Sequence, residues 1–373
     1  MRIFVVLIAF ALTSFAQRHF IEHVDAEKPE GKLLQQIMQE DDQAKKSALL
    51  EQFAGQFPKH EGMPWVLEQL QGIYATSNQP DKVIAAGEKL LALDPDDTGA
   101  GFQSLKAAQT KKDAALIQKF AVATSAAARK MAAAPKPNDA DEATAWKQAV
   151  DYAKQVDTYT EYALYAAALE SRDPKATIGL CEALQQRGPT SEYAVKAVQP
   201  LFAAYYQAGE SEKAVALAER VLATDQTNEE MLLAVADSYL TKKTNLEKAH
   251  AYCTKVVELM AARPKPEGAS DAAWIAHKNL VMGRAHYLNG KVYYSENDFS
   301  KADQVLQTAQ PLVESDAALK PEVLFLLGFA NYKLEKIQEA ANYYRACAAI
   351  QSPFQTSAAK NLQAIQKQYH NVK

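Results

Sequence analysis

Small and apolar residues recur along the chain with the spacing of two short helices joined by a turn. From Pro321 the sequence reads PEVLFLLGFANYKLEKIQEAANYYRACAAIQSP. Leu324 and Gly328 fall on one face of a first helix, and Ala340 and Tyr344 fall on the face of a second helix that would pack back against it. Such a unit recurs with a period of about 34 residues, and a fixed period constrains a fold more strongly than any single motif does.

Four other segments, which begin at Pro64, Val195, Glu229 and Gly283, carry matching residues in the same register. In the first of them Gly87 stands where the pattern has an aromatic residue, so we expect a thinner core at that point. The matches include Leu67, Leu70 and Tyr74; Leu201, Tyr205, Ala214 and Ala218; Leu232, Ala236, Tyr239, Ala249 and Cys253; and Gly290, Tyr293, Ala302 and Leu306. Weaker versions cover residues 31–57, 98–131 and 143–187.

These residues make the chain resemble the tetratricopeptide repeat (TPR), a helix–turn–helix unit. The resemblance implies an all-α fold, a right-handed α-α superhelix with about five recognisable and three degenerate hairpins. Asn331 departs from the pattern, which has a Tyr at that position of the first helix. The polar segment at 354–373 has no partner helix after it, and we expect it to be the capping helix and tail that end the stack.

A second, longer repeat relates residues 38–97 to 169–228, offset by 131 positions, and it pairs Asp42 with Asp173 and Tyr74 with Tyr205. We therefore expect an N-terminal block at 31–187 and a C-terminal block at 188–353, preceded by a flexible segment at 17–30. Two Pro-Lys-Pro segments, 135–137 and 264–266, must be extended connections, and long helices are expected to begin soon after them, near Asp141 and Asp271. Either segment could be a hinge or a longer loop in one stack.

The composition agrees with a helical protein and argues against nucleic acid as a partner. Ala, the strongest helix former, accounts for 68 of the 373 residues, and Gly for only 14. A formal net charge of -4 offers no basic surface for nucleic acid. The oligomeric state does not follow from these features.

The first residues indicate export. Arg2 precedes an apolar run at 3–12, and Ser14 and Ala16 are the small residues of a cleavage site before Gln17. We expect residues 1–16 to be a signal peptide, with the mature protein periplasmic or extracellular and without a membrane span. The three cysteines, Cys181, Cys253 and Cys347, are too few for a disulfide framework and lie in apolar helical runs, so we expect buried thiols.

The sequence shows no arrangement of residues that is typical of catalysis, and we expect neither an enzyme nor a cofactor or metal site. His19 and His23 have the spacing of metal ligands on a helix, but they lie at the expected mature N-terminus. The loop at 94–99 begins like a calcium loop, but Leu105 stands where a bidentate Glu is required. A helical-repeat enzyme, or a regulatory subunit of an envelope enzyme complex, remains the alternative.

The resemblance also implies where a partner would bind. The first helix of each TPR hairpin lines the concave side of the superhelix, and such surfaces bind extended peptides or partner proteins. We therefore expect a non-enzymatic interaction scaffold whose partner is a protein or peptide. In the alternative, Phe325 and Phe329 only pack against the next hairpin or the capping helix. The expected binding residues are Lys196, Tyr206, Gln207, Arg284, Tyr287, Lys291, Tyr294, Phe325, Phe329, Tyr332 and Lys333.

Overall fold

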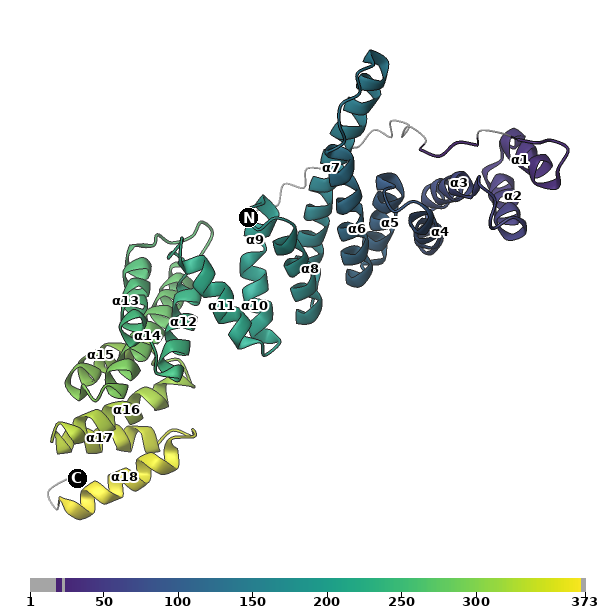
Figure 1. The fold of residues 1–373 in the computed structure, drawn as a ribbon. Helices are drawn as coiled ribbons and strands as arrows, with labels where there is room; N and C mark the ends of the chain where they lie inside the picture. The colour runs from purple at the N-terminus through teal and green to yellow at the C-terminus, as the bar shows by residue number, and fades with distance from the viewer. Residues whose placement is uncertain (1–17, 22–23, 370–373) are drawn as a thin grey trace. The chain divides into compact units, whose positions relative to one another are not determined.

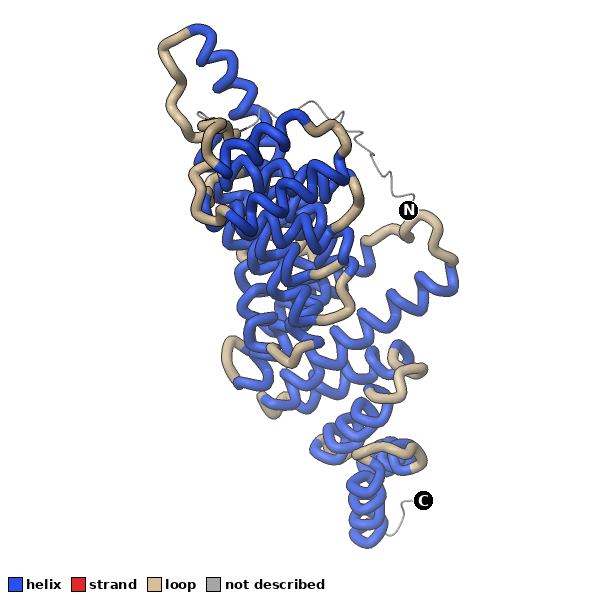
Figure 2. Tube along the Cα trace, turned by 90° about the vertical axis from the view of Figure 1, so that its right-hand side faces the viewer, coloured by secondary structure: helices blue, strands red, loops and turns tan. Residues whose placement is uncertain are grey.

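The computed structural model describes residues 18–21 and 24–369, and in these ranges the regular structure is helical without strands (Figures 1 and 2). The expected signal peptide therefore lies outside the described residues, as does His23. The first half contains α1 (Pro29–Gln39), α2 (Gln43–Gln56), α3 (Met63–Thr76), α4 (Pro80–Leu93), α5 (Thr98–Lys111), α6 (Ala114–Ala132), α7 (Ala140–Glu170), α8 (Pro174–Arg187), α9 (Glu192–Lys196) and α10 (Val198–Gln207). The second half contains α11 (Ser211–Leu222), α12 (Glu229–Lys242), α13 (Leu246–Ala262), α14 (Asp271–Ser295), α15 (Phe299–Leu312), α16 (Leu319–Lys333), α17 (Ile337–Ala348) and α18 (Gln355–Gln368).

Each predicted hairpin corresponds to consecutive helices of the structure, so the predicted all-α repeat fold is confirmed. The recognisable units are α3–α4, α9–α11, α12–α13, α14–α15 and α16–α17, and the degenerate ones are α1–α2, α5–α6 and α7–α8. The long helices α7 and α14 begin at Ala140 and Asp271, close to the predicted starts. Figure 1 shows the helices following one another from α1 to α18 along the chain.

Side chains at the helix ends explain why the hairpins begin and end where they do. Asp42, Asp97 and Asp113 each cap a helix by accepting a hydrogen bond from a main-chain N–H in its first turn. Lys112 and Lys243 lie 131 positions apart, the offset of the longer repeat, and both end a helix in the left-handed conformation, with φ of 54° and 53°. The duplicated segments therefore share their local geometry as well as their residues.

Within each half, the first helices of successive hairpins are neighbours. We call α3, α5, α7, α9 and α10 of the first half and α12, α14 and α16 of the second half the A helices. In the first half α3 contacts α5, α5 contacts α7, and α7 contacts α9. In the second half α12 contacts α14, and α14 contacts α16. The surface that the A helices of the first half form is called the A-helix face below.

The repeat's small residues lie where paired helices touch. A Cβ added to Gly328 in α16 would lie 2.8 Å from the ring of Tyr344 in α17, so only glycine permits this approach. The core at Gly87 is not thin, contrary to expectation. The Gln71 side chain fills the space there and donates hydrogen bonds to the Ala100 carbonyl at 3.1 Å and to Ser104 Oγ at 3.0 Å.

The segment predicted to cap the stack is a helix that covers the last hairpin. Ala358 and Ile365 of α18 are buried in one apolar cluster with Leu324 of α16 and with Tyr344 and Cys347 of α17. The other side of α18 is exposed and polar. This helix therefore ends the stack as a polar cap does in other repeat proteins.

The chain forms two compact units, Met1–Gly209 and Glu210–Lys373. The boundary falls between α10 and α11, inside a predicted hairpin, and at neither Pro-Lys-Pro segment. Each unit is described separately below. Among the helices of the described residues, none has the length and apolar character to cross a membrane.

Candidate functional site

In the second unit, two predicted binding residues are held by an ion pair between neighbouring A helices. Lys291 Nζ of α14 lies 3.1 Å from Glu322 Oε1 of α16 and donates a hydrogen bond to Tyr287 Oη at 2.9 Å. Tyr287 is buried, and burial together with the Glu322 carboxylate raises the pKa of its hydroxyl. Tyr287 and Lys291 therefore join α14 to α16.

Two other predicted residues, Tyr294 and Phe329, belong to an aromatic group. Their ring centroids lie 5.2 Å apart, and Phe299 of α15 packs against both. The exposed Lys333 lies over the Phe329 ring, with Nζ 5.4 Å from its centroid. These side chains thus lie together, and they keep part of their surface accessible.

The remaining predicted residues of the second unit differ in their surroundings. Phe325 packs against Tyr344 and Phe354, with ring centroids 5.7 and 5.4 Å apart, so it lies between the last hairpin and the cap. Tyr332 is partly buried against the same cluster, whereas Arg284 is exposed. For Phe325, these contacts are the packing that we considered as the alternative to a binding role.

The predicted residues Lys196, Tyr206 and Gln207 lie in the first unit and are exposed. Lys196 Nζ lies 2.5 Å from Glu192 Oε1 and 5.5 Å from the centroid of the Tyr193 ring. Tyr206 packs edge-on against Phe202, with 40% of its surface exposed. The predicted set is thus divided between the two units.

The structure also shows an aromatic group that our sequence analysis missed. Five rings form a chain across the A helices α5, α7 and α9 of the first unit, each within 6 Å of the next. The centroid distances are 5.1 Å for Phe102–Tyr159, 5.9 Å for Tyr159–Tyr162, 5.9 Å for Tyr162–Tyr193 and 5.7 Å for Tyr193–Tyr165. We call these five residues the aromatic row.

Most of the aromatic row is accessible and uncharged. Tyr162 is 45% exposed, and the other four residues are half-buried. Burial raises the pKa of the Tyr159 and Tyr193 hydroxyls, so both are neutral at physiological pH. Lys106 lies over Phe102 at one end of the row, with Nζ 5.6 Å from the ring centroid, and Lys196 lies over Tyr193.

The sequence contains one signal that could have revealed this row. Tyr159, Tyr162 and Tyr165 recur at intervals of three residues in the degenerate hairpin at 143–187. Residues three and four apart share one side of a helix, which would have placed the three together. That hairpin matches the TPR pattern poorly, so the face positions could not be transferred to it.

The three free cysteines lack the features of catalytic nucleophiles. Burial raises the pKa of Cys181 and Cys253 to about 12 and of Cys347 to about 11, so these free thiols are buried and protonated at neutral pH. In the part of the chain that the structure describes, no three His, Cys, Asp or Glu residues are grouped to hold a metal ion.

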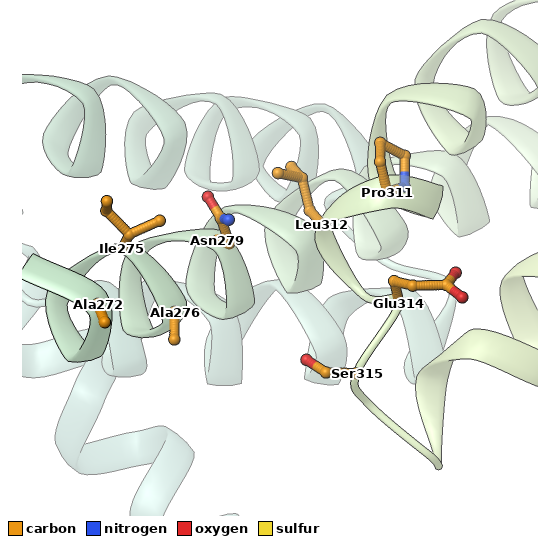
Figure 3. A pocket seen from close by; sticks show the side chains of 8 residues that line it. All are labelled: Ala272, Ile275, Ala276, Asn279, Pro311, Leu312, Glu314 and Ser315. Atoms are coloured by element: carbon orange, nitrogen blue, oxygen red, sulfur yellow. The ribbon is translucent and has the colours of Figure 1, made fainter.

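Figure 3 shows a hollow between the first turns of α14 and the end of α15, away from the predicted binding residues. Its lining is mostly apolar, with Ile275 and Leu312 among the side chains, and its one charged residue is Glu314. Glu314 lies 2.5 Å from Lys320 Nζ in an ion pair. The hollow thus contains one hydroxyl, that of Ser315, and one carboxylate, which is already paired with Lys320.

No known protein family matches the sequence, and no curated protein matches it. Among solved structures, the chain is similar to the TPR domain of P58(IPK), with 13% identity and a TM-score of 0.31 over 92% of this chain and 100% of that one. It is also similar to yeast Tom70, with 11% identity and a TM-score of 0.22 over 93% and 97%. On the packing of its own hairpins, the chain is a helical-repeat protein of tetratricopeptide-like architecture.

Proposed function

We propose that the protein is a non-enzymatic scaffold that binds a protein partner on its A-helix face. The aromatic row of the first unit carries this proposal. Tyrosine rings supply large contact areas at low cost in conformational entropy and are enriched among the residues that dominate binding energies. Five rings in contact across α5, α7 and α9 provide a continuous surface for an extended segment of a partner.

The charges near these rings favour a partner segment with acidic side chains. Lys106 lies over Phe102 at one end of the aromatic row, and Lys196 lies over Tyr193, the fourth ring along it. The pair between Lys196 and Glu192 joins exposed residues on one helix, and such pairs are weak in water. Lys196 can therefore exchange Glu192 for a carboxylate of the partner.

Catalysis is not part of the proposal, because the buried thiols are protonated. The Asp157 carboxylate that accepts the Ser125 hydroxyl is already paired with Arg129 and Arg187. We also propose that the scaffold acts after export, on the strength of the apolar run and cleavage pattern at 1–16. An N-terminus at Gln17 in the exported protein would support this.

Site-directed photo-crosslinking in the native host tests the interaction surface. We expect a photoreactive phenylalanine in place of Tyr162 to crosslink one discrete protein partner, and Lys106→Glu combined with Lys196→Glu to reduce the yield at least severalfold. The matched control places the same group at Val122 of α6, an exposed apolar residue outside the A helices. Equal crosslinking at Tyr162 and Val122, or none at Tyr162, contradicts the proposal.

A further inference from the structure

The described segment before α1 lies against the A helices of the first hairpins, and its side chains are bound there. Arg18 of this segment donates two hydrogen bonds to Asp94, from Nε at 2.6 Å and from Nη2 at 3.2 Å. The ring Nε2 of His19 lies 3.1 Å from Asp97 Oδ2. The partners come from the end of α4 and the start of α5, more than seventy residues further along the chain.

The main chain of the same segment is bound as well. The N–H groups of Arg18 and His19 donate to the two carboxylate oxygens of Glu68 in α3, at 3.3 and 3.4 Å. Ile21 lies beside Gly62, where an added Cβ would be 3.4 Å from the Ile21 side chain. Residues 18–21, which we call the strap, are thus held by main-chain and side-chain contacts, as a bound peptide is.

The surface beneath the strap is strongly acidic. Asp97 is 3% exposed; its Oδ1 caps α5 by accepting the Ala100 N–H, which leaves Oδ2 for the imidazole. Burial raises the pKa of Glu68, and the neighbouring Asp97 carboxylate raises it further. If the strap were absent, the carboxylates of Glu68, Asp94 and Asp97 would have no basic residue of the strap beside them. This surface therefore favours a basic ligand.

The strap has the features of an exchangeable ligand. The Arg18 side chain is 36% exposed, and Phe20 is 68% exposed. The expected cut before Gln17 leaves all four in the mature chain. A basic segment of another protein can make the same contacts with Glu68, Asp94 and Asp97.

We propose that Glu68, Asp94 and Asp97 form a binding site for a basic peptide, and that the strap occupies this site in cis and competes with ligands from other chains. The site lies on α3, the end of α4 and the start of α5, and its contacts involve none of the five aromatic rings. The inference therefore goes beyond the proposed function and does not depend on it.

Peptide binding to the full chain tests the proposal. The probe is a fluorescent, C-terminally amidated peptide with the sequence of residues 17–24, QRHFIEHV, and the readout is anisotropy. We expect the Arg18→Ala, His19→Ala double variant to bind it at least tenfold more tightly than the unaltered chain does. Adding Asp94→Asn should abolish this binding, whereas adding Asp41→Asn, the same change at an exposed site, should preserve it. A peptide with both basic residues replaced by Ala should not bind.

Equal binding by the unaltered chain and the double variant would overturn the proposal, and so would binding that Asp94→Asn leaves intact. Hydrogen exchange provides a second measurement that does not require the double variant to fold. In the unaltered chain the amides of Arg18 and His19 should exchange at least tenfold more slowly than in the free peptide, and Asp94→Asn should remove most of that protection. If the amides of Arg18 and His19 exchange at the free-peptide rate, the strap does not occupy the acidic site and the proposal is contradicted. Loss of crosslinking at Tyr162 would contradict only the scaffold function, because that readout lies outside the acidic site.

Discussion

At the residue scale, the clearest feature is a hydrogen bond that the long repeat preserves. Tyr74 Oη donates to Glu51 Oε1 at 2.5 Å, and Tyr205 Oη donates to Glu182 Oε1 at 2.7 Å. Both members of the second pair lie 131 positions after their counterparts, the offset that the sequence shows. Burial and the Glu51 carboxylate raise the pKa of Tyr74 to about 12, so it remains a donor at physiological pH. Duplication has thus kept a contact between the second helix of one hairpin and the first helix of the next.

We expect Tyr74→Phe and Tyr205→Phe each to lower the free energy of unfolding by about 1 kcal/mol, because each removes a hydrogen bond to a charged acceptor. Urea denaturation measures the change. The control is Tyr162→Phe, whose exposed side chain has no such bond, and this variant should unfold at the wild-type urea concentration. Unchanged stability in both variants would show that the repeated bonds contribute nothing.

At the scale of the element, the close approach of the paired helices depends on glycines. Gly328 faces the Tyr344 ring in the last hairpin, and Gly290 faces the Leu306 side chain in the hairpin before it. A Cβ added to Gly72 in α3 would have no heavy atom within 4 Å. The same substitution therefore has opposite consequences at positions that look alike in the sequence.

We expect Gly328→Ala to destabilise the protein by about 1–3 kcal/mol, because the new methyl group overpacks the contact with Tyr344. Gly72→Ala is the matched control and should stabilise α3 by about 0.5–1 kcal/mol, since alanine loses less backbone entropy in a helix. Chemical denaturation of both variants tests the pair. The same sign of change at both positions would contradict this account of the hairpin contact.

At the scale of the whole molecule, each hairpin is stabilised mainly by its neighbours in the chain, and α18 completes the last one. Ile365 of α18 is 3% exposed, within the cluster that contains Tyr344 and Cys347. In repeat proteins a terminal helix of this kind stabilises the adjacent unit, and the effect weakens with distance along the stack.

We expect Ile365→Asp to destabilise the second unit by at least about 2 kcal/mol, because it removes a buried apolar side chain and places a charge in its position. Amide hydrogen exchange should accelerate in α16 and α17 and stay unchanged in α3 to α6. Ala364→Asp introduces the same charge at the exposed neighbouring position and should leave both regions as they are. Uniform acceleration along the chain would contradict nearest-neighbour stabilisation.

Local sequence determined the helices, the turns between them and their pairing into hairpins. An apolar face with a helical period must find a cover, and a second helix a few residues away provides it at little cost in loop entropy. For this reason even the poorly matching segments at 31–57, 98–131 and 143–187 could be assigned as hairpins. Asp141 and Asp271 predicted the starts of the two long helices to within a residue.

Only the tertiary structure decided which side chains of different hairpins meet. Lys291 was predicted as a partner-binding residue, and only the structure shows that Glu322 of the next A helix lies 3.1 Å from it. The aromatic row joins rings from α5, α7 and α9, and Arg18 reaches Asp94 across 76 positions of the chain. Hairpin formation depends on residues close in sequence, which a period reveals. Contacts between hairpins depend on how their surfaces fit in space, which the pattern within one hairpin does not encode.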